Sequence, residues 1–255
     1  MKILVCVKEV IDPGSPLSLG SDGLIEHTGK LTYRMNRYDE FALEEAVLIR
    51  EKIPGTVITA VSVGPARVKE TLRKALGKGA DHACHIVHES SLFLPPRQTA
   101  SLIAGFAKAG GHDLILAGVM AEDDLYCQVG PLVAAMLGIP FAVSVVSEEL
   151  DAEKGRVCAE CEIEGGLKES VMVTLPCVLA VQSGINRPRY PSLSNTLRAK
   201  AQEIPEIIAH VQAGPGYGTS SLSYPPEAAK GMMLTGSRDD MACELAAMVH
   251  EKGLL

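Results

Sequence analysis

The stretch with the clearest chemical potential is an acidic loop between an apolar run and a helix start, within residues 114–140. The apolar run ends at Gly118, the loop contains Asp123 and Asp124, and Gln128 introduces a helix with an apolar face. A helix N-terminus at the carboxyl end of a parallel strand offers unpaired backbone N–H groups to an anion. This pattern favours a phosphate-bearing ligand. The alternative is an ordinary strand-to-helix turn in which the two aspartates are solvated caps.

Two further strand ends can contribute to the same site. Cys6 lies at the end of the first apolar strand, and Val63 with Gly64 lies at the end of the second. In a doubly wound sheet the first and fourth strands are commonly neighbours where the strand order reverses, so we expect these loops to meet the acidic loop in one crevice. Glycines at 64, 118 and 130 permit close backbone approach, although each can equally serve only its own turn.

No catalytic set assembles from the remaining residues. The sequence has no Gly-x-Ser-x-Gly elbow and no P-loop, and its histidines lack an obvious nucleophile partner. The first strand continues directly into Lys8 and Glu9 without a Gly-x-Gly-x-x-Gly turn, so the standard dinucleotide fingerprint is absent. A nucleotide that binds this chain must therefore use other loops.

The cysteine and histidine spacings do not predict a metal site. Cys158 and Cys161 form a CxxC pair within an alternating strand pattern, where residues an odd number of positions apart point to opposite faces. The same objection applies to His82, His85 and His88. We expect all five to be ordinary strand residues.

Strands and helices alternate over the first part of the chain. This rhythm implies right-handed crossovers and a mostly parallel, doubly wound, Rossmann-like sheet, with strands and helices expected at residues 2–7, 36–52, 56–63, 66–76, 82–87, 98–109, 114–117, 128–137 and 141–146. A loop rich in Pro, Gly and Ser separates the first two elements and can contain a small hairpin around residues 21–23.

The pattern changes after residue 146. Gly165 and Gly166 lie between two strand-like segments, a hairpin signal, and residues 177–181 form another strand that extends the sheet. From residue 183 the rhythm of strand and helix is lost, and the tail ends in an amphipathic helix at residues 239–252 that must dock on something, because an isolated helix of this length is marginal in water. We expect a nucleotide-binding domain at 1–182 and an extended C-terminal arm at 183–255.

Composition argues against nucleic acid and membrane insertion and bears on the cellular compartment. The 255 residues are 47% hydrophobic, enough for a core, and the net charge of −7 without a Lys/Arg cluster argues against nucleic acid. The N-terminus reads as a strand rather than a signal peptide, and no apolar run approaches membrane-spanning length, so no direct membrane insertion is expected. Seven scattered cysteines suit reduced thiols in the cytoplasm.

Taken together, these segments resemble the electron transfer flavoprotein beta subunit, essentially from end to end. The segments that carry the resemblance are KILVCVKEVID, MNRYDEFALEEAVLIRE, VSVGPARVKETLRKALGKGAD, AGVMAEDDLYCQVG, EGGL and NRPRYPSLSNTLRAK. The resemblance implies a non-enzymatic electron carrier that forms a heterodimer with an alpha subunit. The redox FAD lies mainly in the alpha subunit, and the beta subunit holds a buried adenine nucleotide.

The resemblance also implies roles for particular residues. Leu193 matches the position that anchors a partner dehydrogenase, expected to be of the acyl-CoA type, and the C-terminal arm reaches over the alpha subunit. Electrons then pass between that dehydrogenase and a downstream acceptor. The positions implied for the nucleotide are Cys6, Asn36, Asp39, Val63, Gly118, Asp123, Asp124, Cys127, Gln128, Val129 and Gly130.

The acidic loop departs from the family pattern. Members that bind AMP usually read Asp-Asp-Asp-x-Asn-Gln-Thr-Gly, and here Leu125, Cys127 and Val129 replace the third Asp, the Asn and the Thr. The form Gln-Val-Gly-Pro resembles members that carry a second FAD and split electron pairs from NADH. Val119 and Met120 stand where those members have Arg-Gln, which weighs against this interpretation. AMP and a second FAD both remain open.

Two other functions share parts of the pattern. A stand-alone ATP-binding module of the universal-stress type has the same sheet but not this tail, and it would be a monomer that binds ATP unaided. An adenylating ligase needs a reactive lysine or metal-binding acids in the crevice, for which Lys8 with Asp123 and Asp124 is the only candidate set.

Overall fold

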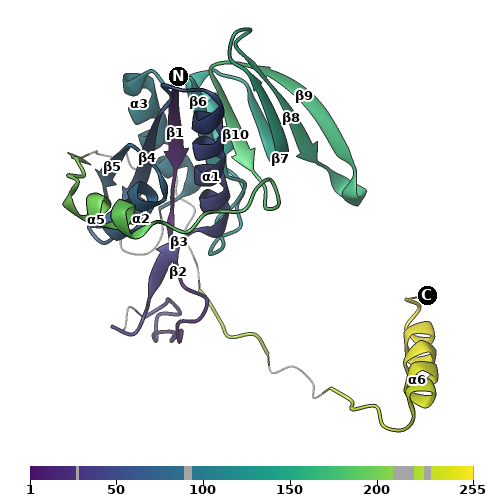
Figure 1. Cartoon of the computed structure of the whole chain (residues 1–255). Helices are drawn as coiled ribbons and strands as arrows, with labels where there is room; N and C mark the ends of the chain where they lie inside the picture. Colours follow the sequence, from purple (N-terminus) through teal and green to yellow (C-terminus); the bar gives the residue numbers. More distant parts are fainter. Residues whose placement is uncertain (27–28, 89–93, 209–220, 227–230, 255) are drawn as a thin grey trace.

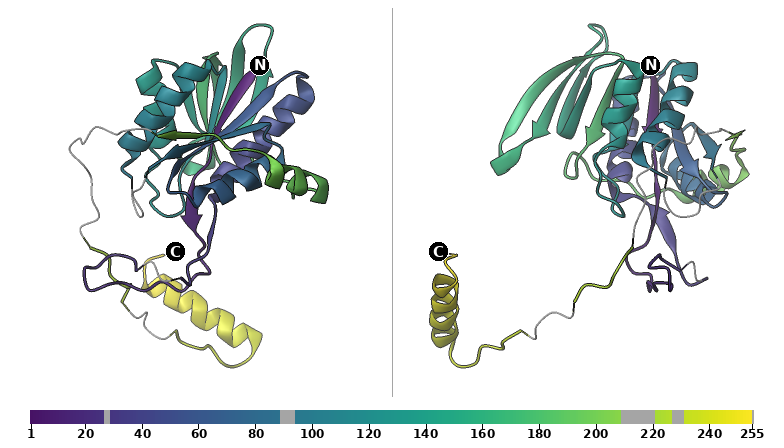
Figure 2. Two further views of the ribbon diagram at one scale, coloured as in Figure 1. Left: turned by 90° about the vertical axis from the view of Figure 1, so that its left-hand side faces the viewer. Right: turned by 180° about the vertical axis from the view of Figure 1, so that it is seen from behind.

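A nine-stranded, mostly parallel sheet forms the centre of the protein in a computed structural model that describes residues 1–26, 29–88, 94–208, 221–226 and 231–254. The strand order is β11-β5-β4-β1-β6-β10-β7-β8-β9. Helices α1 and α2 cover one face of this sheet and α3 and α4 cover the other (Figures 1 and 2). This is the expected doubly wound α/β fold, and the prediction is confirmed.

The elements follow the expected alternation. The strands of the central sheet are β1 Lys2–Cys6, β4 Val57–Gly64, β5 His82–Val87, β6 Leu114–Gly118, β7 Phe141–Asp151, β8 Arg156–Glu162, β9 Lys168–Thr174, β10 Cys177–Val181 and β11 Glu206–Ile208. The helices are α1 Arg37–Lys52, α2 Val68–Lys78, α3 Pro96–Gly110, α4 Val129–Leu137, α5 Leu193–Ala201 and α6 Arg238–Glu251, with one 3₁₀ turn, η1 Glu164–Gly166.

Burial of the strands explains their composition. Strand β10 is buried at all five positions and β1 at four of five, because helices cover both faces of this part of the sheet. Strand β8 instead alternates between buried and partly exposed residues. Cys158 is accordingly half-buried and Cys161 buried, on opposite faces as the spacing predicts.

The point where strand order reverses lies between β1 and β6. Strand β1 pairs in parallel with β4 on one side and β6 on the other, so the chain segments that leave these strands diverge to opposite faces of the sheet. The expected neighbourhood of the first and fourth parallel strands is therefore confirmed. Ligands of open α/β sheets bind in the crevice that such a reversal creates.

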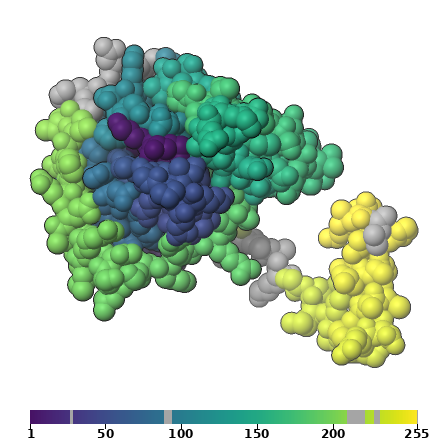
Figure 3. Space-filling view, turned by 45° about the horizontal axis from the view of Figure 1, so that its top comes forward, coloured from purple at the N-terminus to yellow at the C-terminus, as the bar shows by residue number. Residues whose placement is uncertain are grey.

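A three-stranded antiparallel extension continues the sheet on one side. Strands β7, β8 and β9 pair in sequence, and β7 also pairs in parallel with β10. The expected hairpin is present, and η1 with Gly165 and Gly166 at positive φ makes its turn. Figure 3 shows this extension projecting from the body of the domain. Strand β7 is longer than residues 141–146 because its whole second half pairs with β8.

A separate two-stranded ribbon was missed by the sequence interpretation. Strands β2 Glu9–Ile11 and β3 Tyr33–Met35 pair antiparallel below the main sheet (Figure 1). The loop between them has the expected small turn, since an isolated bridge joins Leu19 and Ile25 around residues 21–23. Its tip meets the C-terminal arm, where the Tyr224 hydroxyl donates to the Leu17 carbonyl at 3.2 Å.

The segment after β10 first crosses the domain and then leaves it. Residues 186–189 bind to α1, and α5 packs on α2, where the Arg73 guanidinium donates to the Ala199 carbonyl at 3.0 Å. Helix α6 has no buried residue and lies apart from the domain (Figures 1 and 3). Residues 209–220 and 227–230 of the expected arm lie outside the described residues. Among the helices described, none is long and apolar enough to span a membrane.

A pair of buried glutamates joins α1 to the antiparallel extension. The Glu148 side chain is 1% exposed, and neither of its carboxylate oxygens has a hydrogen-bond partner among the described residues. Glu45 is buried beside it and accepts a hydrogen bond from the Asn186 amide at 2.8 Å. Burial, and then the neighbouring Glu148, raise the pKa of Glu45, which the Asn186 bond and the Lys52 ammonium oppose. The junction is thus most stable when Glu45 is protonated.

This pair predicts a pH-dependent stability. Because the pKa of Glu45 is raised on folding, its contribution is fully present below the ordinary value of about 4.3 and is lost as pH rises through the folded value. Glu148→Gln removes the like charge, so we expect the variant to be about 1 kcal/mol more stable than the parent at about pH 8 and similar at about pH 5. Urea unfolding at both values measures this. Glu149→Gln, at an exposed neighbour, is the control, and parallel profiles for Glu148→Gln and the parent would contradict the assignment.

Candidate functional site

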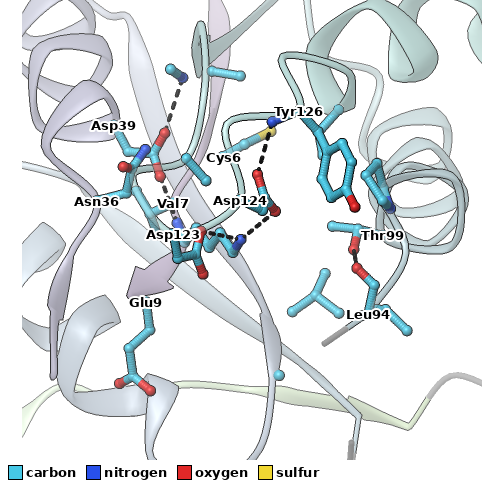
Figure 4. Close-up of a pocket in the computed structure, with 18 of the residues that line it drawn as sticks. Cys6, Val7, Glu9, Asn36, Asp39, Leu94, Thr99, Asp123, Asp124 and Tyr126 are labelled. Atoms are coloured by element: carbon cyan, nitrogen blue, oxygen red, sulfur yellow. Dashed lines mark hydrogen bonds and ion pairs between the residues drawn. The ribbon is translucent and has the colours of Figure 1, made fainter. Parts of the chain in front are cut away.

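A cleft opens at the carboxyl ends of β1, β4 and β6, where the strand order reverses. Counted with the part open to solvent, its volume is about 1100 Å³. One side is formed by the residues that follow β1 and by the loop between β6 and α4. The other side is formed by the end of β4 and the start of α3. Figure 4 shows the residues that line it.

Asp39 connects the two central strands beneath the cleft. Its carboxylate accepts the Lys8 N–H at 2.7 Å and the Gly118 N–H at 3.0 Å, so one side chain holds the ends of both β1 and β6. Burial raises the pKa of Asp39 to about 7, and the hydrogen bonds from Lys8, Asn36 and Gly118 oppose that rise. The side chain lies in the first turn of α1, which fixes it against the sheet.

Asn36 holds the acidic loop from below. It is 1% exposed, and its amide donates to the Met120 carbonyl at 2.9 Å while its side-chain oxygen accepts the Glu122 N–H at 3.1 Å. The Asn36 N–H in turn donates to the Lys8 carbonyl at 2.9 Å. Both the donor and the acceptor of the Asn36 side chain thus bond to the backbone of the loop, which fixes the side chain and the loop together. The loop therefore has a defined path before it reaches the cleft.

Lys8 and the two aspartates form a charged cluster at the cleft wall. The Lys8 ammonium contacts the Asp123 carboxylate at 2.7 Å and the Asp124 carboxylate at 2.8 Å (Figure 4). Asp124 also accepts the Tyr126 N–H at 3.1 Å through its other oxygen. Burial lowers the pKa of Lys8, but the two carboxylates outweigh it and the net pKa is raised. The Lys8 ammonium is therefore charged, and its contacts are with the carboxylates of Asp123 and Asp124.

The loop then takes an unusual backbone path into α4. Leu125 and Cys127 both have φ of 55°, a left-handed conformation that non-glycine residues rarely adopt. Such residues concentrate at ligand-binding loops, where the surrounding structure holds the strained backbone. Helix α4 begins directly afterwards, and its N-cap residue Gln128 makes no side-chain capping bond. The first N–H groups of α4, from Val129 and Gly130, thus lack a capping side chain.

The opposite half of the cleft is more apolar. It is lined by Val63 near the end of β4, by Leu94 just before α3, and by Thr99 and Ile103 in the first half of α3. Tyr126 extends from the acidic loop toward this side, as Figure 4 shows, and is 44% exposed. An apolar slot beside backbone N–H donors is suited to an aromatic base with an attached phosphate.

Comparison with known proteins identifies the family. The sequence profile of the electron transfer flavoprotein domain matches residues 24–211. Electron transfer flavoprotein subunit beta of Bacillus subtilis (strain 168) is 32% identical over 259 residues, covering 99% of this chain and 98% of that protein. The subunits beta of Homo sapiens and Methylophilus methylotrophus are 34% and 31% identical, with at least 95% of each chain covered. The chain belongs to the electron transfer flavoprotein beta-subunit family.

Membership in this family makes the chain an electron transfer subunit and indicates that a flavin takes part in its function. The cleft lies within the matched residues apart from the end of β1 and the residues that follow it. No cluster of three or more histidines, cysteines or acids able to hold a metal ion occurs in the part of the chain that the structure describes.

Most of the residues expected from the sequence to contact the nucleotide line this cleft of the beta-subunit chain. Those that line it are Cys6, Asn36, Asp39, Val63, Gly118, Asp123, Asp124, Cys127, Gln128 and Val129. Gly130 does not line it, because the space at its Cα faces Ala180 and Val178 of β10. Leu193 lies elsewhere, at the start of α5, and is 77% exposed.

The sequence interpretation missed the contribution of α3. Leu94, Thr99 and Ile103 follow β5, and the rule that pointed to the ends of the other strands applies to β5 as well. It also missed the ion pair in which the Arg67 guanidinium contacts the Glu9 carboxylate at 2.6 Å at the cleft margin. Nothing in the spacing of Glu9 and Arg67 signals that contact, because 58 residues separate them.

Proposed function

We propose that this chain is the beta subunit of a heterodimeric electron transfer flavoprotein and binds an adenine nucleotide in the cleft. With an alpha subunit that carries the redox FAD, it transfers electrons between a dehydrogenase, of the acyl-CoA type, and a downstream acceptor. The chain itself performs no bond chemistry. It contributes the docking surface and the nucleotide that support a flavin held by its partner.

The observation that carries the proposal is the cleft at the reversal of strand order. The uncapped N-terminus of α4 offers N–H groups to a phosphate, and the apolar slot beside Val63, Thr99 and Ile103 suits an adenine ring. Cys6 and Asn36 also line the cleft. The adenylate can belong to AMP or to a second FAD, since both present the same half to this cleft.

The residues present suit a nucleotide held mainly by backbone groups. Leu125, Cys127 and Val129 bring no ionic side chain, so Gln128 and the first N–H groups of α4 are the donors for phosphate. The nucleotide supplies negative charge and an aromatic ring, and the chain orients both. The Gln-Val-Gly-Pro form of the loop supports the alternative in which the chain carries a second FAD and splits electron pairs from NADH.

The arm at residues 183–255 supports a second chain as partner. Its described part exposes large apolar side chains without burying any residue of α6. Among them are Tyr190, Leu193, Leu197, Met232, Met233, Leu245 and Leu254. Exposed apolar side chains in this number mark a protein–protein interface. A stand-alone ATP-binding module would not need such an interface.

Purification from the native host tests the proposal. We expect a yellow complex of this chain with one second chain, releasing FAD and one further adenine nucleotide whose mass distinguishes AMP from FAD. A monomer that binds ATP unaided would instead favour the universal-stress interpretation. Pyrophosphate exchange with ATP by the isolated chain would favour the ligase.

Leu193→Ala tests the proposed dehydrogenase anchor. Leu193 is the exposed first residue of α5, and truncating a residue that fills a partner's pocket costs about 2 kcal/mol. We expect the rate at limiting dehydrogenase to fall at least tenfold with unchanged flavin content, since no cofactor contact is lost. Leu17→Ala, at another half-exposed leucine, is the matched control. An unchanged rate for Leu193→Ala would refute the anchor.

A further inference from the structure

The basic side chains that line the cleft are paired with acids of the protein itself. Among its described lining residues, the lysine and arginine side chains are Lys8 and Arg67, and each contacts carboxylates: Lys8 contacts Asp123 and Asp124, and Arg67 contacts Glu9. Asp39 adds a fourth acid at the base. Four acids and two bases leave this lining with an excess of negative charge, reduced when Asp39 is protonated, as its raised pKa of about 7 allows.

This balance differs from that of sites built for nucleoside triphosphates. Such sites direct a lysine or arginine, or a magnesium ion, at the β- and γ-phosphates. Here the Lys8 ammonium, the group best placed for that role, lies 2.7 Å and 2.8 Å from two carboxylates. Phosphate therefore has the N–H groups at the start of α4 as its principal donors. These N–H groups carry no net positive charge, so they do not offset the repulsion between a more highly charged ligand and the acids of the lining.

We propose that Asp123 and Asp124, held in place by Lys8, act as a charge filter that admits AMP or the diphosphate of FAD and rejects ADP and ATP. AMP and the diphosphate of FAD each carry about two negative charges near neutral pH, whereas ADP carries about three and ATP about four. The filter rests on the proposed function, because it concerns the nucleotide that the cleft is proposed to bind.

Local hydrogen bonds hold Asp124 and the backbone of Lys8 in place, and Lys8 in turn contacts Asp123. Asp124 accepts the Tyr126 N–H at 3.1 Å, and the Lys8 N–H is bound by the buried carboxylate of Asp39 at 2.7 Å. Lys8 is thus a positioning residue that orients both acids and limits their mutual repulsion. Each additional phosphate would extend the negative charge of the ligand beside this cluster and weaken binding by about tenfold.

Binding of three nucleotides to the full chain in its native complex tests the filter. The bound nucleotide is removed, and calorimetry in EDTA measures the Kd of AMP, ADP and ATP. We expect the parent to bind AMP at least tenfold more tightly than ADP, and ATP more weakly still. In Asp123→Asn/Asp124→Asn the Lys8 ammonium becomes available to phosphate, so the ratio of ADP to AMP affinity should rise at least tenfold. Glu149→Gln/Glu153→Gln, at two exposed acids outside the cleft, makes the same change in net charge and should leave the ratio unchanged.

A second variant keeps the test independent of loop folding. Lys8→Met leaves the two acids unneutralised and should weaken AMP at least tenfold, and adding Asp123→Asn/Asp124→Asn should restore it. An unchanged ratio in Asp123→Asn/Asp124→Asn, or equal binding of ATP and AMP by the parent, overturns the filter while leaving nucleotide binding intact. The titration of ATP is then repeated with magnesium in place of EDTA, and tight binding that is lost in that variant overturns the filter in favour of a metal role for the acids. A parent complex that binds none of the three overturns both the filter and the proposed nucleotide site.

Discussion

Gly118→Ala is expected to abolish adenine-nucleotide binding and to lower the free energy of unfolding by about 3 kcal/mol. A Cβ at this position would lie 2.5 Å from the Asp39 carboxylate and 2.6 Å from the Tyr38 Cβ. It would also lie 2.9 Å from the Tyr38 carbonyl carbon, which is backbone of α1 and cannot rotate away. Asp39 would have to release the Gly118 N–H, the Lys8 N–H or both, and the ends of β6 and β1 would lose their shared connection.

Two glycine controls separate this effect from the general cost of adding a methyl group. Gly105→Ala lies on the exposed side of α3, where a Cβ meets nothing within 4 Å, and it should stabilise the helix by up to about 1 kcal/mol. Gly130→Ala should be nearly neutral, because its Cβ would lie 3.5 Å from the Ala180 Cβ, an ordinary contact. Urea unfolding and nucleotide titration of all three variants make the comparison. Normal nucleotide affinity in Gly118→Ala would contradict the central role of the Asp39 connection.

The parallel part of the fold could be predicted because buried strands have a recognisable apolar composition. Residues 177–181 match β10 at both ends, since a strand covered on both faces is a continuous apolar run. Residues 82–87 also match β5 at both ends, although two histidines interrupt its apolar residues. The ribbon of β2 and β3 could not be predicted in the same way. Each strand has three residues, and more than 20 residues with no regular pattern separate them. Short strands paired over a long loop leave no periodic signal.

Some features of the site could be predicted from where the strands end, and others depend on tertiary packing. Strand ends place Cys6, Val63 and Gly118 at one crevice, and the structure brings these residues together there. The left-handed backbone at Leu125 and Cys127 has no sequence signal, because neither residue is one that favours that conformation. The reason for a glycine at 118 was also not visible, since it is the Asp39 side chain, far away in sequence, that fills the space beside it.

Arg189→Met is expected to release the start of the C-terminal arm from the domain. The Arg189 guanidinium binds both Glu44 oxygens, with contacts of 2.8–3.0 Å, and also contacts Glu51 at 2.7 Å. Its backbone N–H donates to Glu44 at 3.0 Å. Since Glu44 is only 6% exposed, removing its partner leaves a buried carboxylate without a counter-charge. The cost is about 2–4 kcal/mol, below that of a fully buried pair because the guanidinium is 36% exposed.

The functional consequence follows from the position of this ion pair along the chain. Arg189 precedes α5 by four residues, so its attachment to α1 determines where Leu193 is presented. We expect Arg189→Met to slow electron transfer from the dehydrogenase while the cleft still binds nucleotide, because none of its contacts reach the cleft. Arg189→Met/Glu44→Gln should recover at least half of the lost stability, since it also removes the buried charge. Arg187→Ala, at an exposed neighbour, should change neither unfolding nor transfer, and equal effects of Arg187→Ala and Arg189→Met would show that general positive charge, rather than this ion pair, holds the arm.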